Sequence, residues 1–165
     1  MSKFTSLIVL SIGLLLSVCH GDAQTRGNFS VGFIVGEPTG ISWKYRINAV
    51  HAVDGVVGFS PFDRFRINVD YLWNAQPFEE QNLLLYYGVG GAIGFGRTEY
   101  ITSSGRYAYL VRNEPLGFGA RTVIGLNYSI PKSPVELMFE AAPIVILAPN
   151  AGFGIDAGFG ARFFF

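Results

Sequence analysis

The chain has 165 residues, which is enough for one domain. Hydrophobic residues make up 50% of it and charged residues only 15%, against about 25% in typical soluble domains. Basic and acidic residues are equal at 12 each, so the basic surface that nucleic-acid binding needs is missing. No run of about 20 apolar residues follows residue 24, which excludes a membrane-spanning helix in that part of the chain.

The first 23 residues are interpreted as a cleaved secretory signal peptide. Lys3 supplies the positive charge, residues 7–18 form the apolar stretch, and Ala23 is a small residue at the expected cleavage site. A membrane anchor helix is the alternative, but polar residues follow the short apolar stretch at once. Lipidation at Cys19 is a minor alternative. The mature chain would contain no cysteine, because Cys19 is the one cysteine in the sequence.

Residues 24–165 are expected to form one β-rich domain, because large apolar side chains recur at every second position. In residues 41–48 and 64–74 the odd positions are apolar or aromatic, while most even positions are polar. Residues 153–165 repeat this pattern with glycine at many even positions. Successive side chains of a strand point to opposite faces, so each segment has one apolar and one polar or glycine-rich face.

Turn signals divide this domain into segments that predict an all-β fold, an eight-stranded antiparallel up-and-down transmembrane β-barrel. The expected strands are 28–36, 41–48, 51–60, 64–74, 83–96, 115–128, 135–147 and 153–165. In the seventh of these, Pro143 cannot donate a hydrogen bond to a neighbouring strand, so a bulge or an early strand end is expected there.

The polar face distinguishes a membrane barrel from a soluble one. A soluble barrel turns its apolar face inward, whereas a membrane barrel turns it to lipid and keeps a polar interior. Five basic and five acidic residues share the predicted inner face and would neutralise one another through salt bridges. This interior charge network comprises Lys44, Arg46, Asp54, Arg66, Asp70, Arg121, Glu136, Glu140, Asp156 and Arg162.

Aromatic residues are expected in two belts at the two ends of the barrel. If both termini are periplasmic, the strand directions place one group near the periplasmic edge: Tyr71, Trp73, Tyr87, Tyr128, Phe163 and Phe165. They place a second group near the outer edge: Phe33, Phe59, Phe65, Phe95, Phe118 and Phe153.

The last strand carries the most specific motif. Phe159, Phe163 and the terminal Phe165 alternate as in the C-terminal signature by which outer-membrane barrels are recognised by the barrel assembly machinery, a form of strand addition. Residues 27–165 resemble small barrels of the OmpA/OmpX type. The runs 36–42 and 70–73 are similar to a small outer-membrane barrel family described in spirochaetes and other double-membraned bacteria. This resemblance implies fold and location in the outer membrane, in contact with its lipid and with lipopolysaccharide or an equivalent. It implies no reaction.

Catalytic and cofactor chemistry is not expected. His20 leaves with the signal peptide, and His51 lies in a predicted periplasmic turn with no serine or carboxylate partner beside it. A single histidine without cysteine makes a metal site improbable. The glycine run at residues 88–94 lies inside an alternating strand with no helix after it, which excludes a nucleotide-binding loop. We therefore expect no enzyme activity, no cofactor and no metal.

The longest expected loop, residues 97–114, should be extracellular. Its tyrosines and arginines belong to types that are enriched at binding hot spots, although a plain projecting hairpin explains them as well. The candidate surface-contact residues are Arg97, Tyr100, Arg106, Tyr107, Tyr109 and Arg112. The leading functional hypothesis is a structural and surface-interaction barrel. The alternatives are a narrow pore or passive channel, a soluble lipocalin-like carrier and, last, an enzyme acting on lipid A.

Overall fold

The structure is a computed structural model that describes residues 27–60, 63–103, 106–114, 116–148 and 151–165. The predicted signal peptide, with Cys19 and His20, lies outside these residues and stays a prediction. The described part contains no helix that is long and apolar enough to cross a membrane. It forms nine strands: β1 (Phe29–Gly36), β2 (Thr39–Arg46), β3 (His51–Phe59), β4 (Asp63–Ala75), β5 (Leu83–Ser103), β6 (Arg106–Glu114), β7 (Gly117–Ser129), β8 (Val135–Ala148) and β9 (Gly152–Phe164).

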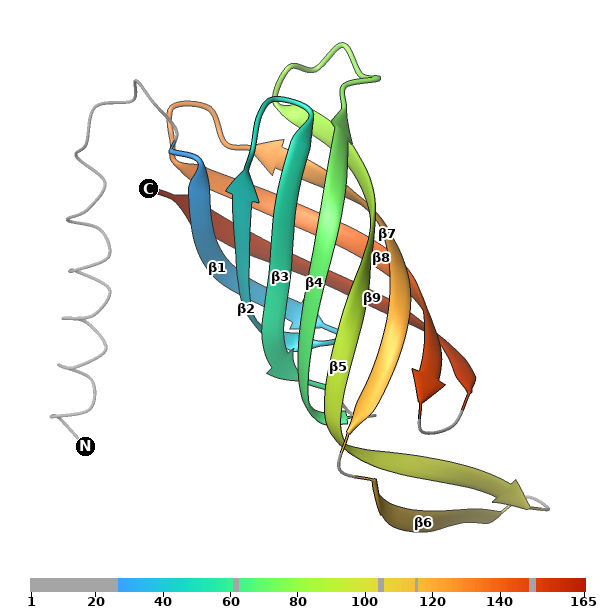
Figure 1. Cartoon of the computed structure of the whole chain (residues 1–165). Helices are drawn as coiled ribbons and strands as arrows, with labels where there is room; N and C mark the ends of the chain where they lie inside the picture. Colours follow the sequence, from blue (N-terminus) through green and yellow to red (C-terminus); the bar gives the residue numbers. More distant parts are fainter. Residues whose placement is uncertain (1–26, 61–62, 104–105, 115, 149–150) are drawn as a thin grey trace, which may run out of the picture.

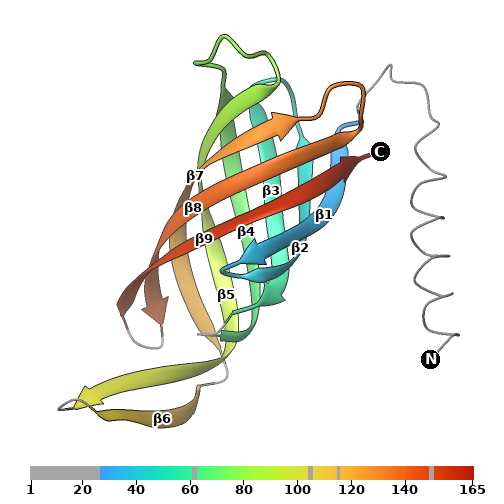
Figure 2. The ribbon, with the colours of Figure 1, turned by 180° about the vertical axis from the view of Figure 1, so that it is seen from behind.

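Eight of the strands close into an antiparallel barrel, which confirms the predicted fold. Each of β1–β5 and β7–β9 pairs with its neighbours, and β9 returns to pair with β1 from Ser30–Phe164 to Gly36–Gly158. Strands β4 and β5 complete the ring (Figures 1 and 2). We call the end with Phe29 and Phe165 the terminal end. The other we call the hairpin end, because β5 and β6 project from it.

The segment 97–114, expected as a long loop or a projecting hairpin, is a β-hairpin. Strand β5 continues past the predicted end at residue 96 to Ser103, and β6 folds back along it, with Tyr100 opposite Tyr109. Strand β6 pairs with β5 and with no other strand, so this ribbon extends beyond the barrel wall. Threonine, tyrosine and isoleucine in this segment favour extended backbone, which explains the longer strand.

Pro143 does not end its strand, so that expectation was wrong. Strand β8 runs through it to Ala148, and Pro143 pairs with Ile155 of β9. On the other side, the β7–β8 ladder skips the two positions between Arg121–Ile144 and Ile124–Ala141. An antiparallel residue directs its N–H and C=O to one neighbour, so proline weakens one ladder and leaves the other intact. The register shift lies elsewhere, between Phe118 and Gly119.

The outer wall of the barrel is apolar. Among the barrel-strand side chains that the structure describes, none that points outward is Asp, Glu, Lys or Arg. Large hydrophobic side chains are exposed along every barrel strand, and Phe33 on β1 is 72% exposed. Trp43 lies over Gly55 of the neighbouring strand, so its indole covers a position that lacks a side chain. An apolar surface that surrounds a whole molecule is far larger than the patches found on soluble monomers.

Aromatic rings gather at both ends of this wall. Near the terminal end, Trp73 stacks on Tyr87 with ring centroids 5.9 Å apart and meets Tyr71 edge-on at 5.0 Å. Near the hairpin end, the ring centroid of Phe65 lies 5.9 Å from that of Phe59 and 5.8 Å from that of Phe95. These two groups lie at opposite ends, as the strand directions predict.

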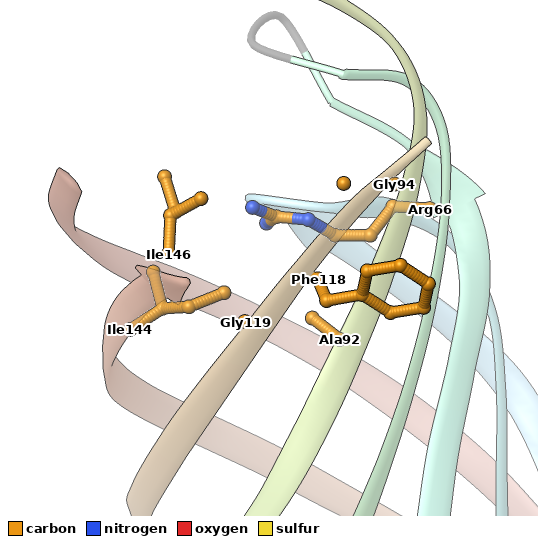
Figure 3. A pocket seen from close by; sticks show the side chains of 8 residues that line it. Arg66, Ala92, Gly94, Phe118, Gly119, Ile144 and Ile146 are labelled. Atoms are coloured by element: carbon orange, nitrogen blue, oxygen red, sulfur yellow. The ribbon is translucent and has the colours of Figure 1, made fainter. Parts of the chain in front are cut away.

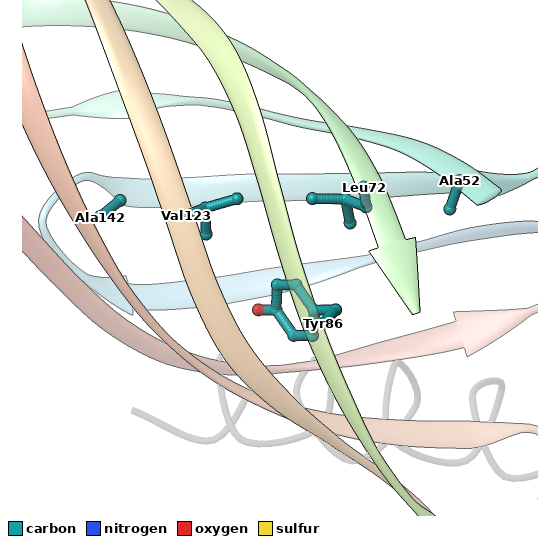
Figure 4. Packing of buried hydrophobic residues seen from close by; sticks show 5 residues of the cluster. All are labelled: Ala52, Leu72, Tyr86, Val123 and Ala142. Carbon is teal, nitrogen blue, oxygen red and sulfur yellow. The ribbon is translucent and has the colours of Figure 1, made fainter. Parts of the chain in front are cut away.

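The interior contains apolar clusters as well as charges, which the sequence analysis did not anticipate. One cluster lies on the inner face of five strands (Figure 4): Ala52, Leu72, Tyr86, Val123 and Ala142. A second joins Ile34, Val56 and Met138. The described interior is therefore partly ionic and partly apolar. An eight-stranded barrel is narrow enough for such side chains to meet across its axis.

Candidate functional site: the charged interior

The ten charged residues predicted for the interior all point inward. Nine of them are buried, and Arg46 at the terminal end keeps a side-chain exposure of 23%. They come from six strands, β2, β3, β4, β7, β8 and β9. Nearly all occupy even positions, and Arg121 is odd because the alternation of β7 is shifted by one residue. The arrangement therefore follows from strand alternation.

At the terminal end, two cations share one carboxylate. Lys44 Nζ lies 3.4 Å from Glu136 Oε1, and Arg46 Nη2 donates to Glu136 Oε2 at 3.0 Å. The Arg46 guanidinium also stacks over the ring of Phe164, with Cζ 3.8 Å from its centroid. Glu136 is fully buried, so its charge depends on both partners.

A second pair crosses the barrel beside this group. Arg162 Nη2 donates to Asp54 Oδ2 at 2.8 Å, and its Nε donates to Ser42 Oγ at 2.9 Å. Arg162 is among the largest fully buried side chains of the described residues. Its planar guanidinium binds two acceptors on two strands at once, which lysine could not do in the same geometry.

In the middle of the barrel, one guanidinium faces three carboxylates. Arg121 lies 3.3 Å from Asp70, 3.3 Å from Glu140 and 3.5 Å from Asp156. A Cβ at Gly90 would overlap Asp70, so this glycine leaves room for the carboxylate. Gly90 pairs with Asp70 of β4 on one side and with Arg121 of β7 on the other, so it lies between the two partners of this ion pair.

The interactions continue to the hairpin end. Asp156 also accepts a hydrogen bond from Arg66 Nη1 at 3.0 Å. The same Nη1 lies 3.8 Å from Glu37 Oε1, and this carboxylate accepts a hydrogen bond from Ser60. Figure 3 shows Arg66 extending beside a small cavity of about 20 Å³, which Ala92 and other residues line. Glu37 was missed by the sequence analysis because it lies in a turn, where alternation gives no signal.

Tyr86 joins the two halves of this network and was also missed. Its hydroxyl donates to Glu140 Oε2 at 3.0 Å, and Lys44 Nζ lies 5.4 Å from its ring centroid. A continuous series of contacts therefore runs from Glu37 at the hairpin end to Arg46 at the terminal end. The signal was available, because position 86 has the same parity as the inward-facing glycines of β5.

The described residues offer no group of three or more His, Cys, Asp or Glu side chains that could hold a metal ion. His51 begins β3 at the terminal end, and its Nδ1 lies 3.0 Å from the hydroxyl of Tyr71. The charged groups of the interior neutralise one another in salt bridges. A buried ion that loses its partner destabilises a protein by about 3–5 kcal/mol.

A family model described as "Protein of unknown function (DUF3996)" matches residues 20–164. The chain belongs to the DUF3996 family. A search of curated proteins found no match. The network described above is thus the interior of a DUF3996 barrel.

Two solved structures resemble this DUF3996 chain. The N-terminal β-barrel domain of Pseudomonas aeruginosa OprF has 14% identity and a TM-score of 0.54, and the match covers 86% of this chain and 100% of that one. Neisserial surface protein A (NspA) has 15% identity and a TM-score of 0.46, with 83% and 93% covered. At this identity the OprF likeness concerns the fold, and it agrees with the strand pairing.

The remaining predicted residues lie on the outer wall and on the projecting ribbon. Phe159 and Phe165 are exposed on β9 and at its end, and Phe163 lies 5.2 Å from Phe165, centroid to centroid. The six candidate contact residues of segment 97–114 lie on the backbone of β5 and β6, and the structure does not describe their side chains.

A double-mutant cycle on the pair Arg162–Asp54 tests whether the network depends on mutual neutralisation. Arg162→Met leaves the Asp54 carboxylate buried without its partner, so we expect the free energy of unfolding to fall by about 3–5 kcal/mol. Asp54→Leu should lower the free energy of unfolding by a comparable amount. The double variant should lose clearly less free energy than the two single variants lose together. Urea unfolding in lipid vesicles measures all four proteins. Glu79→Gln, in an exposed turn, is the control and should change little. Additive losses would contradict the pairing.

Proposed function

We propose that this chain is an outer-membrane β-barrel protein of a double-membraned bacterium, with a structural and surface-interaction role and an interior closed by its salt-bridge network. One observation carries the proposal: the described charges of the barrel strands point inward, and the outer wall is apolar. The predicted signal peptide and the resemblance of the last strand to an assembly signature support export and insertion. The partners would be outer-membrane lipid, lipopolysaccharide or an equivalent, and the barrel assembly machinery.

Lipid surroundings explain both faces of the wall. Backbone N–H and C=O groups cannot remain unpaired in hydrocarbon, so a sheet that crosses a membrane must close on itself. A charged side chain that faces lipid at the bilayer midplane costs about 2–4 kcal/mol, which accounts for an outer wall without charges. A soluble lipocalin-like carrier would need the opposite arrangement, with an apolar cavity inside and a polar surface outside.

The continuous interior network favours a closed barrel over the alternative of a narrow pore or passive channel. Arg121, Tyr86 and Arg162 are all buried, and apolar side chains pack with Tyr86 in the interior. Eight strands leave an interior that side chains can fill. Planar-bilayer recordings distinguish the two functions, because discrete conductance steps would favour the pore.

The projecting ribbon of β5 and β6 supports the surface-interaction role. Beyond Arg97, β5 continues for six residues, or roughly 20 Å at about 3.3 Å per residue. Tyrosine and arginine are frequent in this ribbon, and both are enriched at binding hot spots. His51 lies at the other end of the barrel, so it is not placed to act with the ribbon on a shared ligand. We propose an extracellular ligand for the ribbon and no catalytic role.

Two valines with similar exposure separate a lipid-facing wall from a water-facing one. Val69, in the middle of β4, is 45% exposed, and Val50, in the turn before β3, is 49% exposed. Val69→Arg should lower the free energy of unfolding in lipid vesicles by about 2–4 kcal/mol, because it places a cation in hydrocarbon. Val50→Arg is the matched control and should change it by less than about 1 kcal/mol. Equal, small effects would exclude lipid contact at Val69.

Deletion of residues 100–110 tests the surface role. The outer parts of β5 and β6 pair with each other alone, so the barrel should still assemble without them. Cells that carry the shortened protein should lose adhesion to the surface that the full-length protein recognises. Protease resistance of the barrel in isolated membranes confirms assembly. Unchanged adhesion with an assembled barrel would remove the ribbon as the contact surface.

A further inference from the structure

A cavity of about 300 Å³ lies in the mouth of the barrel at the terminal end. Its walls come from β2 and the turn after it, the end of β4, the connection between β4 and β5, and Ser129 at the end of β7. This volume is at the lower end of the range of small-molecule sites, which is about 300–1,000 Å³. The cavity shares no lining residue with the small cavity beside Arg66, so the two are separate features of the interior.

Side-chain amides dominate the lining of this mouth cavity. Five of its lining residues are carboxamides: Asn48, Asn74, Gln76, Gln81 and Asn82. Asn48 Oδ1 stabilises the turn before β3, because it accepts hydrogen bonds from the backbone N–H groups of Val50 and His51. Asn82 Nδ2 donates a hydrogen bond to Glu80 Oε1. Gln76 and Gln81 make no side-chain hydrogen bond to a described residue and are exposed. A carboxamide both donates and accepts, which suits it to binding another amide.

The floor of the mouth cavity carries an excess of positive charge. Lys44 and Arg46 both line it, and they share the single carboxylate of Glu136. Arg46 retains a partly exposed guanidinium, whereas Lys44 is almost wholly buried. Glu80 lies at the rim, in an exposed position beside Asn82, where water screens its charge. The accessible cation at the floor is therefore Arg46, whose planar group suits a carboxylate.

Asn74 lines the same region, and its carboxamide oxygen is buried. Asn74 Oδ1 is buried, and no described residue donates a hydrogen bond to it. The backbone N–H of Asn74 donates to Val50 O at 2.6 Å, which joins this end of β4 to the turn before β3. A buried acceptor is costly unless a donor reaches it. The carboxamide oxygens that a ligand with N–H donors would reach are therefore those of the exposed Gln76 and Gln81.

We propose that the mouth cavity binds a short peptide through its free C-terminal carboxylate. Arg46 receives the carboxylate, and the amides of Gln76 and Gln81 bind the peptide groups that precede it. This site is separate from the proposed surface contact, which lies on the ribbon at the other end of the barrel. It needs the folded barrel and does not need lipid on the outer wall, so its failure would leave the proposed function standing.

Calorimetric titration of the refolded full chain in detergent micelles tests the proposal with three probes. N-acetyl-dialanine presents a free carboxylate and two peptide N–H groups, and its C-terminal amide is the matched neutral probe. Gluconate presents a carboxylate with hydroxyl donors instead. We expect the acetylated dipeptide to bind at least about tenfold more tightly than its amide and more tightly than gluconate. No binding, or equal binding of acid and amide, would overturn the proposal, and preferred binding of gluconate would overturn the peptide assignment.

Three variants assign the binding to this cavity. Arg46→Gln should remove the preference for the acid over the amide. Gln81→Ala, in the connection between β4 and β5, should weaken both dipeptide probes several-fold and leaves the barrel strands unaltered. Asn28→Ala replaces an exposed carboxamide at the same end that does not line the cavity, and it should change nothing. Binding that survives both Arg46→Gln and Gln81→Ala unchanged would place the ligand elsewhere and contradict the proposal.

Discussion

The closure of the sheet is the constraint on which the rest of the molecule depends. Once β9 pairs with β1 and β4 pairs with β5, each barrel strand has a neighbour on both sides. Strand alternation then allots every side chain to one of two surroundings, the outer wall or the narrow interior. The same alternation that makes the wall apolar brings Lys44 and Glu136, from distant parts of the chain, to within 3.4 Å of each other.

The interior combines two modes of filling space. Ion pairs around Arg121 and Arg162 satisfy charges that could not remain buried alone, while apolar clusters around Leu72 and Ile34 occupy the rest. Tyr86 belongs to both, because its ring packs in the apolar cluster and its hydroxyl binds Glu140. At the terminal end the interior opens into a cavity of about 300 Å³, where the guanidinium of Arg46 remains partly accessible.

Alternation in the sequence was sufficient to predict the eight barrel strands and the inward direction of all ten charged residues. Alternation gave no correct prediction where turn geometry, strand propensity or strand register decides the structure. Glu37 lies in a turn, so its contact with Arg66 depends on tertiary folding. The extension of β5 to Ser103 reflects strand propensity in a segment that its polar residues made look like a loop. Pro143 stays in its strand because an antiparallel residue directs its hydrogen bonds to one side, and the individual ion pairs depend on register, which one sequence does not specify.

The two native tryptophans test most directly whether the outer wall of the barrel faces lipid or water, because the sequence contains no others. Trp43 and Trp73 both lie on the outer wall, and each is followed in the chain by an inward-facing polar residue. In vesicles whose acyl chains carry bromine, the fluorescence of both should be strongly quenched, and a water-soluble quencher should have little effect. If the water-soluble quencher acts strongly and the brominated lipid does not, the outer wall faces water and the assignment of apolar side chains to lipid is wrong.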